Sequence, residues 1–176
     1  MASPLEQVDL RDWALAERDM APHITTLTEY ASHAHKIVEF GTRGGVSTWA
    51  FLDGLPESGL MWSVDINECT VPPRVSRDPR WTFVLGDDTD PAIHDILPAL
   101  ADLVFIDTSH EYEHTAAELQ IAQAMEPDRI ICHDAKWWGV QKAVMEFCAE
   151  SRWEAVRLDE AHDEQGDFSL VVLEQR

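Results

Sequence analysis

One stretch of the chain decides the fold, and it reads Val38-Glu39-Phe40-Gly41-Thr42-Arg43-Gly44-Gly45-Val46-Ser47-Thr48. Its apolar start is typical of a buried strand, and the run Thr48–Leu52 that follows is helix-like. Gly41, Gly44 and Gly45 lack a Cβ atom, so the backbone between strand and helix can approach a ligand closely. The helix also points its free N–H groups into the same crevice, at the carboxyl ends of the strands of an open α/β sheet. The alternative is an ordinary turn between a strand and a helix.

The next strand strengthens the prediction of a binding site. Leu60–Val64 is a short apolar run, and it ends in Asp65. An acid about 20 residues beyond a glycine turn can accept hydrogen bonds from a ribose diol. Taken alone, Asp65 would be an ordinary carboxylate at a strand end. Together with the glycine turn, it favours a ribose-binding role.

Strands and helices alternate along the rest of the chain. We expect strands over 36–40, 60–65, 81–85, 101–106, 128–133, 152–157 and 168–173, and helices over 47–54, 90–99, 112–125 and 138–149. This alternation, followed by a final hairpin, predicts an α/β fold whose mostly parallel sheet has helices on both faces and an antiparallel end.

The remaining segments complete the prediction of a single domain. Residues 5–34 indicate one or two helices, the first capped by Asp9 and the second started by Pro22. We expect this N-terminal helical segment, residues 1–34, to pack on a main domain that spans residues 35–176. Residues 66–80 predict an irregular connection because they carry three prolines, and the acidic residues 158–167 predict the turn of the final hairpin.

The composition bounds the class of protein. The chain has 176 residues, of which 45% are hydrophobic, and its formal net charge is −20. The acidity argues against nucleic acids and anionic membranes as partners, because phosphate binding needs clustered Lys and Arg. No apolar run has the length of a membrane span, and no basic region precedes an apolar core at the N-terminus, so we expect a cytoplasmic protein. The charge fits either an ordinary acidic surface or adaptation to high salt.

A second group of polar residues follows two later strands. Leu103–Ile106 ends in Asp107, and Ile130–Cys132 ends in His133 and Asp134. If these strands are neighbours in a parallel sheet, the three side chains converge at the same edge as the glycine turn. Two carboxylates and an imidazole can hold a divalent cation, with oxygen ligands suiting Mg²⁺ or Mn²⁺ and the imidazole admitting Fe²⁺, Co²⁺ or Zn²⁺. The alternative is that these strand-end acids only cap the helices that follow.

Other histidines differ in what their positions indicate. His110 lies three residues beyond Asp107, and its imidazole could take a proton from a substrate hydroxyl, although a surface loop histidine is the alternative. We expect His33 and His35, at a helix end before the first strand, to be solvated. His114 would pair with His110 on a metal only if both lay on one helix, and His110 should precede the helix.

Taken together, these residues resemble the pattern of a known family. The chain is similar to class I S-adenosylmethionine-dependent methyltransferases and, within them, to small metal-assisted O-methyltransferases of the catechol, caffeoyl-CoA and cephalosporin-biosynthesis-like groups. The resemblance covers roughly residues 35–174. It rests on Glu39–Thr48 and on the later strand ends Asp65, Gly86–Asp88, Asp102–His110 and His133–Asp134. It implies a Rossmann-like, doubly wound, seven-stranded sheet with an antiparallel C-terminal hairpin.

The resemblance also implies a cofactor site for S-adenosylmethionine. The methionine part of the cofactor would be lined by Gly41, Thr42, Arg43 and Ser47. Asp65 would bind the ribose hydroxyls, and Asp87 and Asp88 would border the adenine. Three further residues complete the expected cofactor site: Glu39, Gly45 and Asp107.

Catalysis in this family implies a metal and a base. Asp107, His133 and Asp134 would be ligands of a divalent metal, with Mg²⁺ expected first. His110 would be the catalytic base, at a position where the catechol-type enzymes carry a lysine. The reaction expected is O-methylation of a small hydroxylated acceptor, because a metal-bound hydroxyl is held in a fixed direction and favours its oxyanion.

Three other functions remain open from the sequence. A nicotinamide-dependent oxidoreductase would explain the glycine turn and Asp65, although the spacing is not G-x-G-x-x-G. A catalytically inactive cofactor-binding module would keep the fold, and a metal-dependent hydrolase would explain the acids but not the glycines. Trp137 and Trp138 could flank an aromatic acceptor or belong to the core. The N-terminal helices could cover the pocket or form the interface of a homodimer.

Overall fold

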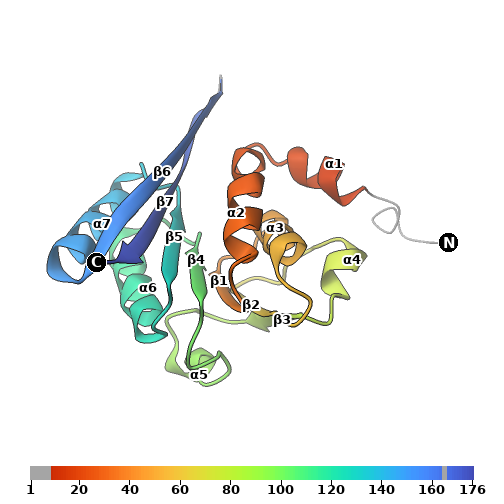
Figure 1. The fold of residues 1–176 in the computed structure, drawn as a ribbon, viewed down its shortest axis with the longest axis horizontal. Helices are drawn as coiled ribbons and strands as arrows, with labels where there is room; N and C mark the ends of the chain where they lie inside the picture. Colours follow the sequence, from red (N-terminus) through yellow and green to blue (C-terminus); the bar gives the residue numbers. More distant parts are fainter. Residues whose placement is uncertain (1–8, 164–165) are drawn as a thin grey trace.

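A mixed β-sheet is the frame of the molecule. The structure, a computed structural model, describes residues 9–163 and 166–176 of the chain. Within these residues the strands are β1 (Lys36–Phe40), β2 (Leu60–Asp65), β3 (Trp81–Leu85), β4 (Leu103–Ile106), β5 (Arg129–His133), β6 (Trp153–Asp163) and β7 (Gly166–Gln175). They form one seven-stranded sheet in the order β3-β2-β1-β4-β5-β7-β6 (Figure 1). The strands β1 to β5 are parallel, and β7 is antiparallel to both β5 and β6, which confirms the predicted fold.

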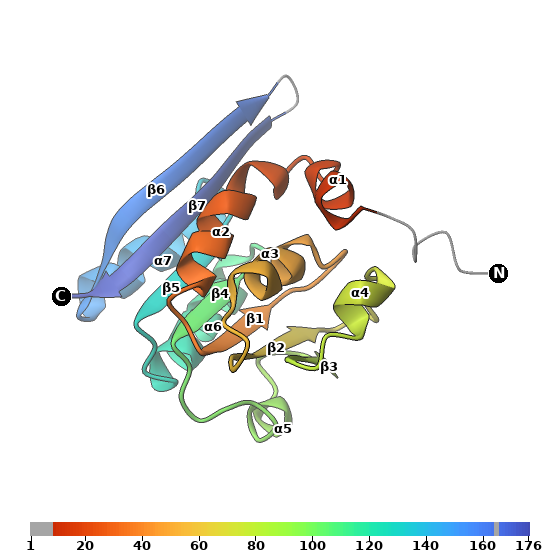
Figure 2. The ribbon, with the colours of Figure 1, turned by 45° about the vertical axis from the view of Figure 1, so that its right-hand side comes forward.

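Helices cover both faces of this sheet. The helices are α1 (Leu10–Leu15), η2 (Ala21–His23), α2 (Ile24–Ala31), α3 (Val46–Gly54), α4 (Pro73–Ser76), α5 (Pro91–His94), α6 (Tyr112–Ala124) and α7 (Trp138–Glu150). Helices α1 to α4 pack on one face, and α5 to α7 pack on the other (Figure 2). Among the described residues, no helix combines the length and the apolar character needed to cross a bilayer.

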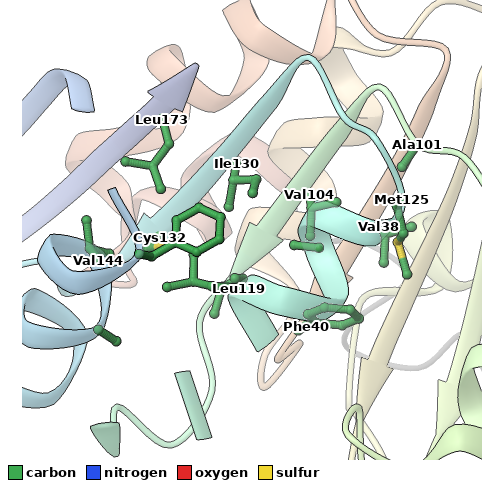
Figure 3. Close-up of a cluster of buried hydrophobic side chains, with 14 of the residues drawn as sticks. Val38, Phe40, Ala101, Val104, Leu119, Met125, Ile130, Cys132, Val144 and Leu173 are labelled. Carbon is green, nitrogen blue, oxygen red and sulfur yellow. The ribbon is translucent and has the colours of Figure 1, made fainter. Parts of the chain in front are cut away.

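Alternating side chains of the strands build the two cores. In β1, Ile37 faces the α2–α3 layer, whereas Val38 and Phe40 face the α6–α7 layer. The same alternation in β4 and β5 gives near-continuous apolar runs, as expected for strands buried on both faces. Figure 3 shows the α6–α7 side, where Val104 and Ile130 lie with Val38 and Phe40 in one cluster of buried side chains. This packing fixes where each strand ends.

The ends of β1 and β4 define the place where a ligand can bind. From β1 the chain runs outward through β2 to β3, and from β4 it runs the other way to β5. In doubly wound sheets, the crevice at such a reversal is the usual ligand site. The register sets Phe40 beside Ile106, so Gly41 and Asp107 follow side by side.

Three sequence expectations for the local structure can be compared with the structure. Asp9 caps α1, with its carboxylate accepting hydrogen bonds from the N–H groups of Arg11 and Asp12, as predicted. The helix expected over 90–99 ends at His94; turns continue to Leu97, the residue at which Pro98 disfavours helical backbone. The irregular connection 66–80 contains the short helix α4.

The C-terminal hairpin is longer than the sequence suggested. The turn was expected over 158–167, but β6 continues to Asp163 and β7 begins at Gly166. Cross-strand pairs continue into this acidic run, with Leu158 opposite Val171 and Ala161 opposite Phe168. Backbone pairing with β7 therefore overrides the turn propensity of the acidic residues, and the two strands reach beyond the ends of β4 and β5 (Figure 1).

Candidate functional site

The glycine turn lies against the end of β4. Gly41 has a φ of 86°, and a Cβ atom placed on it would lie 2.0 Å from the carbonyl oxygen of Asp107. Only glycine fits this position, because the left-handed backbone and the close approach both exclude a side chain. The N–H of Asp107 donates to the carbonyl oxygen of Phe40 at 2.8 Å. The predicted cofactor residue Gly41 and the predicted metal ligand Asp107 are therefore in direct contact.

The buried side chain of Glu39 supports the glycine turn. This side chain is fully buried and accepts hydrogen bonds from the hydroxyls of Ser47 at 2.6 Å, Thr48 at 2.7 Å and Ser63 at 2.5 Å. Burial raises the pKa of Glu39 to about 7, against the lowering effect of these hydrogen bonds. The carboxyl group thus ties the end of β1 to α3 and β2. Glu39 would therefore act on a cofactor indirectly, through the glycine turn that it supports.

Asp65 supports the same turn through hydrogen bonds to its backbone. One carboxylate oxygen accepts from the backbone N–H groups of Thr42 at 2.9 Å and Arg43 at 3.0 Å, and the other accepts from Asn67 at 2.8 Å. Burial would raise the pKa of Asp65, but these backbone hydrogen bonds outweigh it and lower the pKa. The structure places Asp65 next to the turn, where the sequence predicted a ribose contact.

A small pocket lies between the turn and the N-terminal segment. Glu17 and Met20 line it from one side, and residues 42–47 together with Asp107 line it from the other. The guanidinium of Arg43 binds the Asp19 carboxylate at 2.7 Å, which fastens the N-terminal segment over the turn. Of the predicted methionine-binding residues, Thr42, Arg43 and Ser47 line this pocket and Gly41 does not, while Gly45, predicted for the cofactor site as a whole, lines it too.

The three predicted metal ligands and the predicted base, His110, converge beside this pocket. One donor atom from each of Asp107, His110, His133 and Asp134 lies within 4.8 Å of the others. His110 Nε2 is 3.2 Å from Asp107 Oδ1 and 3.4 Å from Asp134 Oδ2. His133 Nδ1 is 3.2 Å and 3.4 Å from the same two oxygens. The two imidazoles and two carboxylates thus alternate around a ring.

Local backbone geometry brings these four side chains together. Parallel pairing sets Ile106 beside Cys132, so Asp107 and His133 follow at one edge of the sheet. His110 has a φ of 58° and Asp134 a φ of 50°, which is uncommon for residues other than glycine and is typical of functional sites. A Cβ atom on Gly139 would lie 2.2 Å from the His110 carbonyl oxygen, so α7 can pack against this loop only through glycine.

The ring attracts positive charge. Burial alone would raise the pKa of Asp107, but the charge of His133 and hydrogen bonds from His110 and His133 hold it below its usual range. Burial alone would lower the pKa of His133, but the Asp107 and Asp134 carboxylates raise it to about 10. His23 packs edge-on against His133 at 5.6 Å, and burial lowers the pKa of His23 to about 4. His23 is therefore a neutral neighbour of the ring.

Asp87 and Asp88 belong to a separate group after β3. The Asp87 carboxylate accepts from the N–H and hydroxyl of Thr89, while Asp88 is buried with Oδ1 3.0 Å from His114 Nε2. Burial raises the pKa of Asp88 and, together with the charge of Asp88, raises that of the fully buried Glu118 well above its usual value. Glu118 accepts from the Thr108 hydroxyl at 2.8 Å, so this group adjoins the end of β4.

The sequence did not indicate every residue of the site. His23 and the Asp19 carbonyl reach His133 from the N-terminal helices, and no spacing in the sequence links positions so far apart. His114 faces Asp88 instead of His110, because His110 precedes α6 as expected. His33 and His35 are exposed, as predicted. Trp137 is 59% exposed with its ring 5.4 Å from His110, so it is a wall of the site and no part of the core.

Comparisons with known proteins agree with this geometry. A family model described as a methyltransferase domain matches residues 38–135, which span β1 to β5. A search of curated proteins finds no match to this chain.

Solved structures share the whole fold at low sequence identity. An O-methyltransferase from Bacillus cereus in complex with S-adenosylhomocysteine is 19% identical, with a TM-score of 0.70 over 100% of this chain and 92% of that one. The O-methyltransferase TomG from Streptomyces achromogenes, in complex with S-adenosylmethionine, is 16% identical, with a TM-score of 0.68 over 99% and 91% of the two chains. The N-methyltransferase NodS from Bradyrhizobium japonicum is 12% identical, with a TM-score of 0.65 over 92% and 98%.

The family match covers more than half of the chain and includes the glycine turn, the acid that ends β2 and the polar ring after β4 and β5. This match rules out the nicotinamide-dependent oxidoreductase and the metal-dependent hydrolase as alternatives. The chain belongs to the class I S-adenosylmethionine-dependent methyltransferases.

Proposed function

We propose that this methyltransferase methylates a hydroxyl oxygen of a small acceptor and that a divalent cation assists the reaction. The observation that carries the proposal is the ring of Asp107, His110, His133 and Asp134 beside the glycine turn. The fold alone does not choose the acceptor atom, because NodS shares it and is named an N-methyltransferase. The names of two other similar structures, both O-methyltransferases, support oxygen as the acceptor.

The proposed cofactor site uses the residues around the turn. The methionine part of S-adenosylmethionine would lie against Gly41, Thr42, Arg43, Gly45 and Ser47, with Asp107 at the same edge and Glu39 supporting the turn. Asp65 would bind the ribose, and Asp87 and Asp88 would border the adenine. The pocket between residues 42–47 and Asp107 supports this placement, because it lies where the turn and the polar ring meet.

The proposed chemistry follows from the position of the ring. Methyl transfer is an in-line displacement, so the protein mainly has to orient the acceptor oxygen toward the sulfonium methyl group. Asp107, His133 and Asp134 would hold the divalent cation, which when bound favours the ionised form of an acceptor hydroxyl. His110 Nε2, on the exposed side of the ring, would accept the proton from that hydroxyl.

Trp137 suggests the shape of the acceptor. The indole group of Trp137 is largely exposed and lies beside His110. His110 is on the open side of the cluster formed with Asp107, His133 and Asp134. An exposed tryptophan next to a catalytic group offers a flat apolar surface on which an aromatic ring can stack. We therefore propose a small acceptor that carries a hydroxyl group on an aromatic ring.

The experiment that tests the proposal measures cofactor binding and product together. S-adenosylhomocysteine binding is measured by calorimetry with and without a divalent metal. The protein is then incubated with labelled S-adenosylmethionine and matched phenols, anilines and thiols. We expect cofactor binding in both conditions and methyl ethers as products only when a metal is present. Exclusive methylation of nitrogen or sulfur would reject the proposal, as would cofactor binding without any transfer.

Replacing a ring carboxylate gives a sharper test. We expect Asp134→Ala to lower methyl transfer by about 10³-fold, since a cation supplies several kcal/mol of charge stabilisation, while S-adenosylhomocysteine binding largely survives. Asp107→Ala should lower methyl transfer by a similar factor. Asp53→Ala, at an exposed position on α3, is the matched control and should keep full activity. Undiminished turnover in both ring variants would remove the metal from the mechanism.

A further inference from the structure

We propose that the ring binds a transition-metal ion of the Zn²⁺ type in preference to Mg²⁺, with His110 as a fourth ligand while no acceptor is bound. The inference deepens the proposed function, because it concerns the same cluster and names the ion that the cluster selects. It departs from the sequence expectation of Mg²⁺ and rests on the donor atoms, their spacing and the hydrogen-bond partner of His133.

The donor atoms favour a transition metal. The ring offers two imidazole nitrogens and two carboxylate oxygens. Mg²⁺ is a hard cation that takes oxygen ligands in a near-ideal octahedron and keeps several waters. Imidazole suits Zn²⁺, Fe²⁺, Ni²⁺ and Cu²⁺, and a given site binds Zn²⁺ or Co²⁺ more tightly than Mn²⁺. The two imidazoles would each replace an oxygen that Mg²⁺ prefers.

The spacing of the donors fits four-coordinate geometry. The four edges of the ring are 3.2, 3.4, 3.4 and 3.2 Å long. Zn²⁺ binds nitrogen and oxygen at about 2.1 Å, and a tetrahedron with such bonds has edges of about 3.4 Å. An octahedron around Mg²⁺, with bonds of similar length, has edges of about 3.0 Å. The two edges of 3.4 Å equal the tetrahedral value, and the two of 3.2 Å lie midway between the values for the two geometries.

The far nitrogen of His133 indicates which nitrogen can bind a metal. His133 Nε2 lies 3.4 Å from the carbonyl oxygen of Asp19, and a carbonyl can only accept a hydrogen bond. Nε2 can donate to this carbonyl, and Nδ1 then points at Asp107 and Asp134, which it contacts at 3.2 Å and 3.4 Å. Metal-binding histidines usually donate their other N–H to a carbonyl or carboxylate in this way. A cation bound between the two carboxylates would take the place of the proton that Nδ1 carries in the charged ring.

A proton on His133 Nδ1 is the competing explanation. It would make a charge-assisted hydrogen bond, for which N–O distances of about 2.7–2.9 Å are usual. The distances from Nδ1 are 3.2 Å to Asp107 and 3.4 Å to Asp134, and those from His110 Nε2 are the same. Each of these distances is longer than the N–O distance of such an ion pair. Each is close to the edge length of a metal-centred tetrahedron.

His110 is the ligand that can give way. His133 is 1% exposed and held by the Asp19 carbonyl, whereas the His110 side chain is 22% exposed and lies on a loop with positive φ. A catalytic zinc site keeps one position for water or substrate. The acceptor hydroxyl would take the position that His110 leaves, and the freed Nε2 would lie beside it. Both roles of His110, ligand and base, then belong to different stages of one cycle.

The test uses metal ions alone as probes. The chain is stripped with a chelator and titrated with Co²⁺, whose visible absorption is intense in four-coordinate sites and weak in six-coordinate ones. We expect one Co²⁺ per chain with intense bands, displaced by one equivalent of Zn²⁺. We expect Mg²⁺ to displace it only with an affinity at least about 100-fold lower than that of Zn²⁺. Calorimetry of each ion gives the same ranking independently.

Matched histidine variants locate the ion. His110→Gln should weaken Co²⁺ binding by at least the roughly 10- to 100-fold that loss of an outer partner costs, and should remove the intense bands. His33→Gln, which changes an exposed histidine in the same way, should leave both unchanged. S-adenosylhomocysteine binding by His110→Gln confirms that the variant is folded. His133→Gln is a second test of the ring if His110→Gln is unstable.

The outcomes separate this inference from the proposed function. A weak six-coordinate Co²⁺ spectrum, equal affinity for Mg²⁺ and Zn²⁺, or no bound metal would each overturn the inference. If S-adenosylhomocysteine still binds and hydroxyls are still methylated in chelator, the O-methyltransferase proposal stands without a metal. If the Co²⁺ site behaves as expected but only nitrogen or sulfur is methylated, the metal inference stands and the proposed function fails.

Discussion

At the end of β1, all four carboxylate oxygens of Glu39 and Asp65 accept hydrogen bonds from hydroxyl or backbone N–H donors. At the ends of β4 and β5, the carboxylates of Asp107 and Asp134 instead face two ring nitrogens at 3.2–3.4 Å. Both regions place paired acids at the carboxyl edge of the same sheet. The first region satisfies its acids with hydroxyl and backbone N–H donors, whereas the acids of the second face titratable imidazoles at longer distances.

The difference separates a supporting frame from the place where we propose that the reaction occurs. Satisfied carboxylates lock the glycine turn in one shape, because each lost hydrogen bond would leave a buried polar group without a partner. Carboxylates gathered around imidazoles create a place that favours positive charge, as the raised pKa of His133 shows. The two regions touch at Gly41 and Asp107, so the frame also sets the position of the proposed reaction site.

The largest expected effect comes from the contact between the two regions. Gly41→Ala should lower the free energy of unfolding by about 4 kcal/mol or more, because the new Cβ would overlap the Asp107 carbonyl in a left-handed backbone. Urea unfolding measures the change. Gly44→Ala is the control, since no atom lies within 4 Å of its added Cβ, and it should change stability far less. Equal effects in both variants would mean that the two regions are not in tight contact.

The next effect tests how the frame responds to pH. Glu39 has a folded pKa of about 7, above its ordinary value of 4.5, so the folded state binds this proton more tightly than the unfolded state. Below pH 4.5 both states are protonated. As pH rises toward 7 the unfolded state ionises first, and stability falls by about 3 kcal/mol before it levels off.

Glu39→Gln isolates that contribution. The variant keeps the shape of the protonated side chain and cannot ionise, so the difference in unfolding free energy between wild type and variant should shift by about 3 kcal/mol across this pH range. Urea unfolding at a series of pH values measures it. A constant difference across the range would mean that Glu39 is ionised in the fold, and that the frame carries its own negative charge.

The smallest effect concerns the ion pair that fastens the N-terminal segment over both regions. The Arg43 side chain is 66% exposed, so solvent screens its pair with Asp19. Asp19→Asn should lower the free energy of unfolding by less than about 1 kcal/mol, and the loss should shrink in high salt. Unfolding at two salt concentrations measures it. A loss that salt does not alter would show that Asp19 acts by packing.

Local sequence signals predicted the frame well. The strands expected over 36–40, 60–65 and 81–85 have those bounds in β1, β2 and β3. An apolar run that stops at glycine, as at Gly41 and Gly86, or at an acid, as at Asp65, indicates locally where a buried strand ends. The fold class followed from the order of such runs. The residues of the turn, together with Asp107, His133 and Asp134, were also expected, because they lie at strand ends that were predicted.

Long-range contacts were beyond these signals. His23 and the Asp19 carbonyl reach His133 only because the N-terminal helices pack over the sheet. The sequence assigned residues 158–167 to a turn, but pairing with β7 extends β6 through most of this acidic run. The placement of His114 beside Asp88 depends in the same way on how α6 packs against the end of β3.

The sequence by itself determined the class of fold, the glycine turn and the identity of the polar residues at each strand end, because apolar periodicity and chain-breaking residues act locally. The tertiary structure alone decided the distances among Asp107, His110, His133 and Asp134, and with them the metal preference that we propose for the ring. Metal selectivity depends on donor spacing of a few tenths of an ångström. Spacing of that kind is set by strand register, by left-handed backbone at His110 and Asp134, and by helices packed from distant parts of the chain.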